Sequence, residues 1–156
     1  MTDARGPGRD PGAGVLVRPA RRSEIPAVLA LWREADAVPS VSDDPASLAR
    51  LLDTSEDALL VAEEGGRLVG TIVAGWDGWR GNLYRLAVLP TERRRGIALR
   101  LVAEAEQRLT RKGAVRLSAL VVSEHDPAVA LWHAAGYGHD PRVRRYVRSL
   151  RPAAGP

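Results

Sequence analysis

The amino-acid sequence predicts a mixed α/β fold, in which helices cover a central β-sheet. Two apolar runs that meet at Gly65-Gly66 are typical of a β-hairpin. A long amphipathic segment at residues 96–111 lies between two further strand-like runs, as a helical crossover does. With 156 residues, the chain has about the length of one domain.

The first half of the chain is expected to contain two helices and three strands. Ser23 can cap a helix that runs to about Ala35, because apolar side chains follow it at helical spacing. Asp44-Pro45 can open a second helix to Leu52, since proline is tolerated in the first helical turn. The expected strands are residues 15–17, 58–62 and 67–76.

The second half alternates strands and helices. Leu83–Leu89 has the pattern of a strand that Pro90 ends. The helix over Gly96–Arg111 has one continuous apolar face and ends at Gly113. The remaining elements are a strand at 115–122, a helix at 126–135 and a weaker strand at 143–147, and the pattern also allows a short strand near residue 137.

The two ends of the chain differ from its middle. Residues 1–14 and 151–156 contain little that a core could bury, and we expect both to be flexible tails. A single folded domain is therefore expected over residues 15–150. No stretch resembles a signal peptide or approaches the ~18 apolar residues of a membrane span. These observations favour a cytoplasmic protein without a membrane partner.

Composition excludes several classes of site. The chain has no cysteine, which excludes disulfides, thiolate metal sites and a cysteine nucleophile. Its three histidines lack partners at ligand spacing, so we expect no metal. Phenylalanine is absent and other aromatic residues are few, which argues against a base-stacking surface for nucleic acid. The net charge of +4, in which Lys112 is the only lysine, also suits a polyanionic small molecule.

One segment suggests a binding site for a phosphate group. After the strand that Pro90 ends, an arginine-rich turn leads into a helix that begins at Gly96. Helix N-termini bind phosphates through unpaired N–H groups, and Gly96 and Ala98 leave the backbone accessible there. Three arginines beside the helix would add charge-assisted donors for a pyrophosphate. The alternative is a solvated arginine run before an ordinary helix.

The same segment resembles the signature of the GNAT acetyltransferase superfamily, Q/R-x-x-G-x-G/A, through Arg93-x-x-Gly96-x-Ala98. Glu124–Tyr137 is similar to the family's second segment, E-N-x-x-A-x-x-L-Y-x-x-x-G-F/Y. The loop Gly75–Gly81 and the following Leu83–Leu86 look like one branch, the YpeA-type acetyltransferases. The resemblance spans residues 15–150.

This resemblance implies a GNAT fold: a twisted, mostly antiparallel sheet of about six or seven strands with about four helices, splayed at the cofactor site. Acetyl-CoA is expected between strands 83–89 and 115–122. The implied reaction is direct transfer of the acetyl group to a primary amine of a small molecule or peptide. The residues that the resemblance assigns to the cofactor are Leu86, Ala87 and Val88 for pantetheine, Arg93, Arg94, Arg95, Gly96, Ile97 and Ala98 for the pyrophosphate, and His125 and Trp132 from the second segment.

The chain departs from the family pattern at the groups that handle protons. Trp132 stands where the family has a tyrosine acid, and core packing is its alternative role. Leu120 and Asn82 stand at two positions where family members carry a glutamate base. Tyr84 and Asp77 are our candidate catalytic residues. The alternatives are a bound water or the acids Glu34, Asp36, Asp43 and Asp44.

Several functional questions stay open at this point. We expect Trp79 and Arg80 at the substrate mouth, where Arg80 would suit an acceptor with a carboxylate or phosphate. A protein that binds CoA without turnover, as a sensor or partner subunit, is the main alternative. A nucleic-acid binder rests only on the arginine count and is not expected. Val143–Leu150 could pair with a second copy, which makes a homodimer possible.

Overall fold

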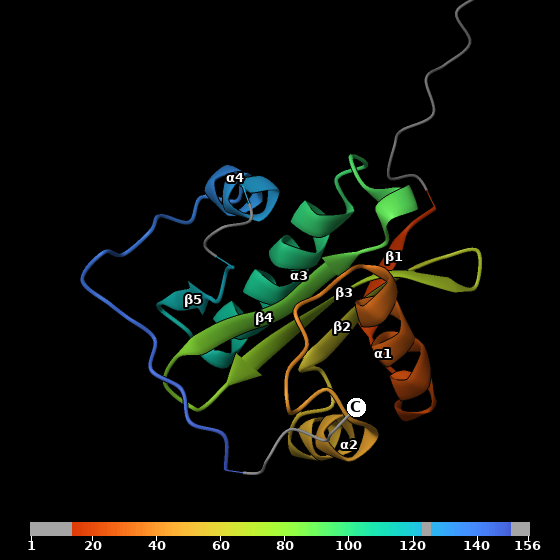
Figure 1. Cartoon of the computed structure of the whole chain (residues 1–156), viewed down its shortest axis with the longest axis horizontal. Helices are drawn as coiled ribbons and strands as arrows, with labels where there is room; N and C mark the ends of the chain where they lie inside the picture. The colour runs from red at the N-terminus through yellow and green to blue at the C-terminus, as the bar shows by residue number, and fades with distance from the viewer. Residues whose placement is uncertain (1–13, 123–125, 151–156) are drawn as a thin grey trace, which may run out of the picture.

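The computed structural model describes residues 14–122 and 126–150, and in them a five-stranded sheet lies between two helical layers (Figure 1). The strands lie side by side in chain order, antiparallel from the first to the fourth, whereas the fifth is parallel to the fourth. The strands are β1 Leu16–Pro19, β2 Leu59–Glu64, β3 Arg67–Trp76, β4 Gly81–Val88 and β5 Leu117–Ala119. The helices are α1 Ile25–Glu34, α2 Pro45–Thr54, α3 Ile97–Lys112 and α4 Asp126–Ala134.

The mixed α/β prediction is confirmed, and its hairpin and crossover lie where the sequence indicates. Gly65 and Gly66 join β2 to β3, and both have positive φ values (59° and 79°). The predicted cap of α2 is also correct, because the Asp44 side chain accepts a hydrogen bond from the Ser47 N–H at 2.8 Å. The cap of α1 is not Ser23, which lies in a 3-10 turn. The N-cap residue of α1 is Glu24, whose carboxylate accepts from the Arg21 N–H at 2.8 Å and so caps the preceding 3-10 turn.

Each face of the sheet carries its own core. One, which we call the α3-side core, includes Leu60, Ile72, Leu83, Ile97, Leu101 and Trp132. The other, the α1-side core, includes Val28, Trp32, Leu59, Val61, Val73 and Leu89. Successive strand residues point to opposite faces, so the near-continuous apolar runs of β2 and β3 supply both cores.

The C-terminal part departs from the predicted pattern. β5 has three residues instead of the eight expected at 115–122, and residues 135–150 contain neither helix nor strand. The expected strand at 143–147 is therefore wrong, and no strand forms near Tyr137. Val143 and Tyr146 are exposed, so no core covers this segment and its apolar side chains cannot stabilise a strand. The described sheet consequently has five strands, fewer than the six or seven expected.

The segment of α4 and Tyr137 is held against α3 by the packing of Trp132 and by one polar contact. The rings of Trp132 and Tyr137 meet edge to face with centroids 4.9 Å apart. The Tyr137 hydroxyl donates to Glu106 Oε1 at 2.8 Å, and burial together with this carboxylate raises the pKa of Tyr137. Within the described ranges, no helix has the length and apolar character needed to cross a membrane. The predicted tails lie outside the described residues except at Gly14.

The close approach of α3 to β3 depends on Gly70. A Cβ at this position would lie 3.0 Å from Leu101 Cδ1 and 3.1 Å from the Ala87 carbonyl oxygen. We expect Gly70→Ala to lower the free energy of unfolding by about 1–3 kcal/mol, because the backbone oxygen cannot move aside. Gly138→Ala, at a site with no atom within 4 Å, is the matched control and should be nearly neutral. Equal urea-unfolding curves for the two variants would contradict this account.

Candidate functional site

The site begins where β5 separates from β4. The two strands pair only from Gly81 to Leu83, and the last contact is the Leu120 N–H donating to the Leu83 carbonyl at 3.2 Å. Beyond this point, residues 84–88 keep β3 on one side, and no described strand pairs with their other edge. A free edge of this kind can accept an extended ligand as an added strand. Leu86, Ala87 and Val88, which were expected to pair with pantetheine, all lie on it.

A β-bulge interrupts β4 within this edge. Thr71 lies opposite Ala87 and Val73 opposite Tyr84, so Arg85 and Leu86 together face Ile72. Arg85 has a φ of 52°, a left-handed conformation that is uncommon for residues other than glycine. Tyr84 lies on the α1 side of the sheet, because its partner Val73 packs in the α1-side core.

The free edge of β4 continues into the N-terminus of α3. A 3-10 turn at Pro90–Glu92 and the arginine-rich turn link the two elements. Gly96 precedes the helix with a φ of 73°. Because glycine has no side chain, it supplies no capping hydrogen bond. The first-turn N–H groups are therefore available to an anion, and the helix dipole favours one there. Pairing groups and anion donors thus follow one another along a single path.

The three arginines of the turn have different surroundings. Arg95 donates to Glu64 at 2.7 and 2.8 Å and to Glu92 at 2.5 Å. The hydrogen bonds to Glu64, which have the larger effect, and to Glu92 raise the pKa of Arg95. Arg93 donates to the carbonyls of Val88 and Ala35 at 3.4 and 3.3 Å. Arg94 makes no hydrogen bond or ion pair with any residue that the structure describes. Of the three side chains, Arg94 is the best placed to reach a pyrophosphate.

Asp77 has a structural task at the tip of the β3–β4 hairpin. Its Oδ1 atom accepts from the Arg80 N–H at 2.7 Å and from the Trp79 N–H at 2.8 Å. These two hydrogen bonds, that of Arg80 first, lower the pKa of Asp77. A carboxylate whose charged form is stabilised in this way is a weaker base, so the contacts favour turn formation over proton removal. The Arg80 guanidinium stacks on the exposed Trp79 ring, 4.2 Å from its centroid.

Tyr84 differs from Asp77, because its functional group is not engaged by the protein. Its side chain is 37% exposed, and its ring lies over Gly75, where an added Cβ would be 3.3 Å from Tyr84 Cε2. Among the described residues, none forms a hydrogen bond with the Tyr84 hydroxyl. This hydroxyl, at the start of the free edge, is available to a ligand.

The two residues expected from the second segment have different outcomes. Trp132 is only 7% exposed and belongs to the α3-side core, so packing accounts for most of its surface. A contact with the cofactor would involve only the remaining fraction. His125 lies outside the described residues.

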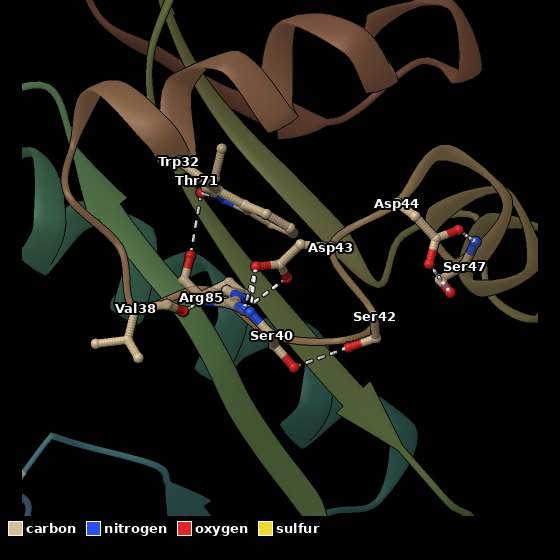
Figure 2. Close-up of polar contacts among 9 residues, drawn as sticks. All are labelled: Trp32, Val38, Ser40, Ser42, Asp43, Asp44, Ser47, Thr71 and Arg85. Atoms are coloured by element: carbon tan, nitrogen blue, oxygen red, sulfur yellow. Dashed lines mark hydrogen bonds and ion pairs between the residues drawn. The ribbon is translucent and has the colours of Figure 1, made fainter. Parts of the chain in front are cut away.

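Sequence reasoning missed a polar cluster on the α1 side of the bulge. Figure 2 shows the Arg85 guanidinium between the Asp43 carboxylate and the Val38 carbonyl, with Trp32 and Thr71 beside it. Asp43 was considered only as one of several alternative candidates for the base, and Arg85 had no assigned role. The available signal was Thr71, a single hydroxyl within the apolar run of β3 that needs a buried partner.

The chain matches the family model described as "Acetyltransferase (GNAT) family" over residues 26–137. The chain belongs to this family. It is 32% identical over 121 residues to Acetyltransferase ECA0875 from Pectobacterium atrosepticum, covering 78% of this chain and 86% of that protein. Acetyltransferase SG1711 from Sodalis glossinidius is also 32% identical over 121 residues, covering 78% and 85% respectively.

Solved structures share the fold at lower identity. Ard1 from Thermoplasma volcanium has a TM-score of 0.71 at 17% identity, covering 80% of this chain and 82% of that one. Aminoglycoside N-acetyltransferase AAC(6')-Iy in complex with CoA has a TM-score of 0.67 at 20% identity, covering 86% and 94%. The expected GNAT fold is therefore confirmed.

Family membership makes this GNAT protein an acyltransferase with acetyl-CoA as cosubstrate. The geometry fits that molecule, because the free β4 edge suits an extended amide-containing arm and the α3 N-terminus suits a pyrophosphate. Among the described residues, no group of three or more His, Asp or Glu side chains could hold a metal ion.

The division among the arginines predicts a selective loss of cofactor affinity. We expect Arg94→Ala to weaken acetyl-CoA binding roughly tenfold, because one charge-assisted hydrogen bond contributes about 1.5 kcal/mol or more. Arg111→Ala, in the last turn of α3, removes the same charge at the opposite end of the helix and should leave binding unchanged. Isothermal calorimetry measures both. Unchanged affinity in Arg94→Ala would assign the pyrophosphate to the backbone alone.

Proposed function

We propose that this chain is an N-acetyltransferase that transfers the acetyl group of acetyl-CoA directly to a primary amine of a small molecule or peptide. The observation that supports it best is the free edge of β4, which begins beside Tyr84 and leads into the N-terminus of α3. Such an arrangement would hold one long anionic molecule and leave the partly exposed Tyr84 accessible to a second substrate.

Some residues of the chain would hold acetyl-CoA, and others would assist proton transfer from the acceptor amine. Acetyl-CoA supplies an activated acetyl thioester. The backbone of Leu86–Val88 holds the arm that carries it, and the first turn of α3 with Arg94 holds the pyrophosphate. The acceptor amine must lose a proton, and a group on the α1 side of β4 is suited to assist.

Tyr84 is the side chain that we assign to proton handling. The Asp43 carboxylate is paired with Arg85, and Asp44 caps α2. Asp77 caps the hairpin turn, and Glu34 lies 3.9 Å from the Arg67 guanidinium. Against these engaged acids, Tyr84 presents a hydroxyl on the free edge. Neither of the glutamate positions noted above is needed if Tyr84, acting as a phenolate or through a water that its hydroxyl orients, takes up the ammonium proton.

The proposed acceptor class rests on the tip of the β3–β4 hairpin. Trp79 and Arg80 form a stacked pair at the β3–β4 tip, which we place at the substrate mouth. An aminoglycoside acetyltransferase of the same fold has been solved with sisomicin, at 19% identity and a TM-score of 0.66. We extend the capacity for a small-molecule acceptor to this chain as part of the proposal.

The deciding experiment measures CoA release with a thiol reagent over a panel of amines and N-terminal peptides. The protein itself is silent in this assay because it contains no cysteine. Amine-dependent release supports the transferase and identifies its acceptor. Calorimetric binding of acetyl-CoA without release from any acceptor would instead support the alternative, a CoA-binding protein that acts as a sensor or partner subunit.

Replacing Tyr84 tests the assignment of proton handling. We expect Tyr84→Phe to lower kcat about 100-fold, within the range of general acid–base contributions, while the acetyl-CoA Kd changes less than twofold. Tyr146→Phe is the control, because Tyr146 is exposed in the C-terminal segment. Equal kcat values for wild type and Tyr84→Phe would move the proton transfer to water.

Arg80 gives a test of acceptor charge. We expect Arg80→Ala to raise KM for amines that also carry a carboxylate or phosphate, and to leave KM for amines without an acidic group unchanged. Steady-state kinetics with matched pairs of acceptors measure this difference. The same KM change for both kinds of acceptor would remove Arg80 from acceptor recognition.

A further inference from the structure

Arg85 makes four kinds of contact from one strained position. Its guanidinium Nη2 donates to both oxygens of Asp43 at 2.5 and 2.6 Å, and Nη1 donates to the Val38 carbonyl at 2.6 Å (Figure 2). The same group lies 5.1 Å from the centroid of the Trp32 ring. Its backbone carbonyl accepts a hydrogen bond from the Thr71 hydroxyl at 3.0 Å. We call these four residues, Trp32, Thr71, Asp43 and Arg85, the Arg85 clasp.

Thr71 connects the clasp to the core. It is a fully buried polar residue, and its hydroxyl both accepts from Trp32 Nε1 at 2.9 Å and donates to Arg85. Both hydrogen-bonding capacities of this hydroxyl are therefore used without water. Trp32 is thereby fixed beneath the guanidinium, so the backbone and side chain of Arg85 are both held from the α1 face.

The clasp also fixes the connection between α1 and α2, residues 35–44. Asp43 Oδ2 accepts from the Ser40 N–H at 2.9 Å, so the carboxylate that holds Arg85 also shapes this loop. At the other end of the loop, the Ala35 carbonyl accepts from Arg93, which belongs to the turn before α3. The loop is thus tied to the cofactor-binding path at two points, one at each of its ends.

A left-handed conformation at a residue other than glycine persists only where surrounding contacts determine it. The side chains of Arg85 and Asp43 are 18% and 20% exposed, which distinguishes the pair from an isolated surface ion pair. Asp43 engages Nη2, the Val38 carbonyl engages Nη1, and the stacking on Trp32 further restricts the guanidinium to one orientation. The contacts therefore hold the bulge and the loop in one relative placement.

We propose that Arg85 is a positioning residue for acetyl transfer, acting through the clasp. This inference rests on the proposed function. The bulge begins the edge that holds the acetyl-bearing arm, and the loop lies on the face where Tyr84 and the acceptor would meet. Reacting atoms must approach to about 3–3.5 Å, so a small shift between these two parts lowers the rate strongly.

Two variants open the clasp in different ways. Asp43→Asn keeps the size of the side chain but removes its charge. Arg85→Asn removes the guanidinium, and asparagine tolerates the positive φ, so the backbone conformation is not disfavoured. For each we expect at least a tenfold fall in kcat/KM for the acceptor, while the acetyl-CoA Kd changes less than threefold. The double variant should lose no more than the larger single loss, because both substitutions break one unit.

A matched ion pair at the far edge of the sheet supplies the control. Arg18 of β1 donates to both carboxylate oxygens of Glu24 at 2.6 and 2.9 Å, and these side chains are 14% and 17% exposed. Glu24→Gln removes the charge from an arginine–carboxylate pair of similar burial, on a strand that does not neighbour β4. It should change kcat/KM less than twofold, even where its melting temperature falls as much as that of Asp43→Asn.

Amide hydrogen exchange tests the clasp without turnover. We expect Asp43→Asn to accelerate exchange both in the loop, residues 36–44, and in the bulge, residues 84–87. Faster exchange in the loop alone would overturn the proposal, as would kcat/KM values within twofold of wild type for both folded variants. If the proposed function itself fails, the wild-type protein will bind acetyl-CoA but release no CoA whichever acceptor is added. Amide exchange in the bulge would still decide whether the clasp couples the bulge to the loop.

Discussion

The free edge of β4 is the constraint on which the rest of the site depends. Backbone N–H and C=O groups need hydrogen-bond partners, and β5 supplies them only as far as Leu83. Residues 84–88 are consequently open to a partner from outside the protein. The bulge then turns Tyr84 and Arg85 toward the α1 face, and α3 begins where the edge ends. One interruption of strand pairing thus produces the free edge on which the proposed function rests.

The arginines around this edge differ in the groups that they contact. Arg95 and Arg85 are both committed to carboxylates, and each thereby fixes a segment of backbone next to the edge. Arg93 donates to two carbonyl groups, whereas Arg94 is exposed and makes no side-chain hydrogen bond with a described residue. An arginine-rich turn that looks uniform in the sequence is therefore divided between framework and binding. The N–H groups at the start of α3 lie next to this turn and add partial positive charge there.

The elements that could be predicted from the sequence are those with local causes. α3 and its glycine boundaries follow from periodicity and backbone conformation, and the Asp44 cap follows from a short pattern. The strand at 143–147 failed because an alternating pattern forms a strand only where a neighbour and a core are present. The Arg85 clasp could not be predicted, since Asp43 and Arg85 are 42 positions apart and neither stands out locally. Their pairing depends on the bulge, which is itself a product of the folded sheet.

The missing side chain at Gly70 has a consequence beyond packing. Because α3 rests directly on β3, the N-terminus of the helix and the neighbouring edge of β4 belong to one stiff body. The N-terminus of α3 and the edge of β4 therefore have fixed relative positions before a ligand binds. The entropy lost on association then falls mainly on the rotatable bonds of the ligand rather than on the protein. A glycine of β3 directly beneath α3 thus limits the entropy that the protein loses when a long, flexible cosubstrate binds.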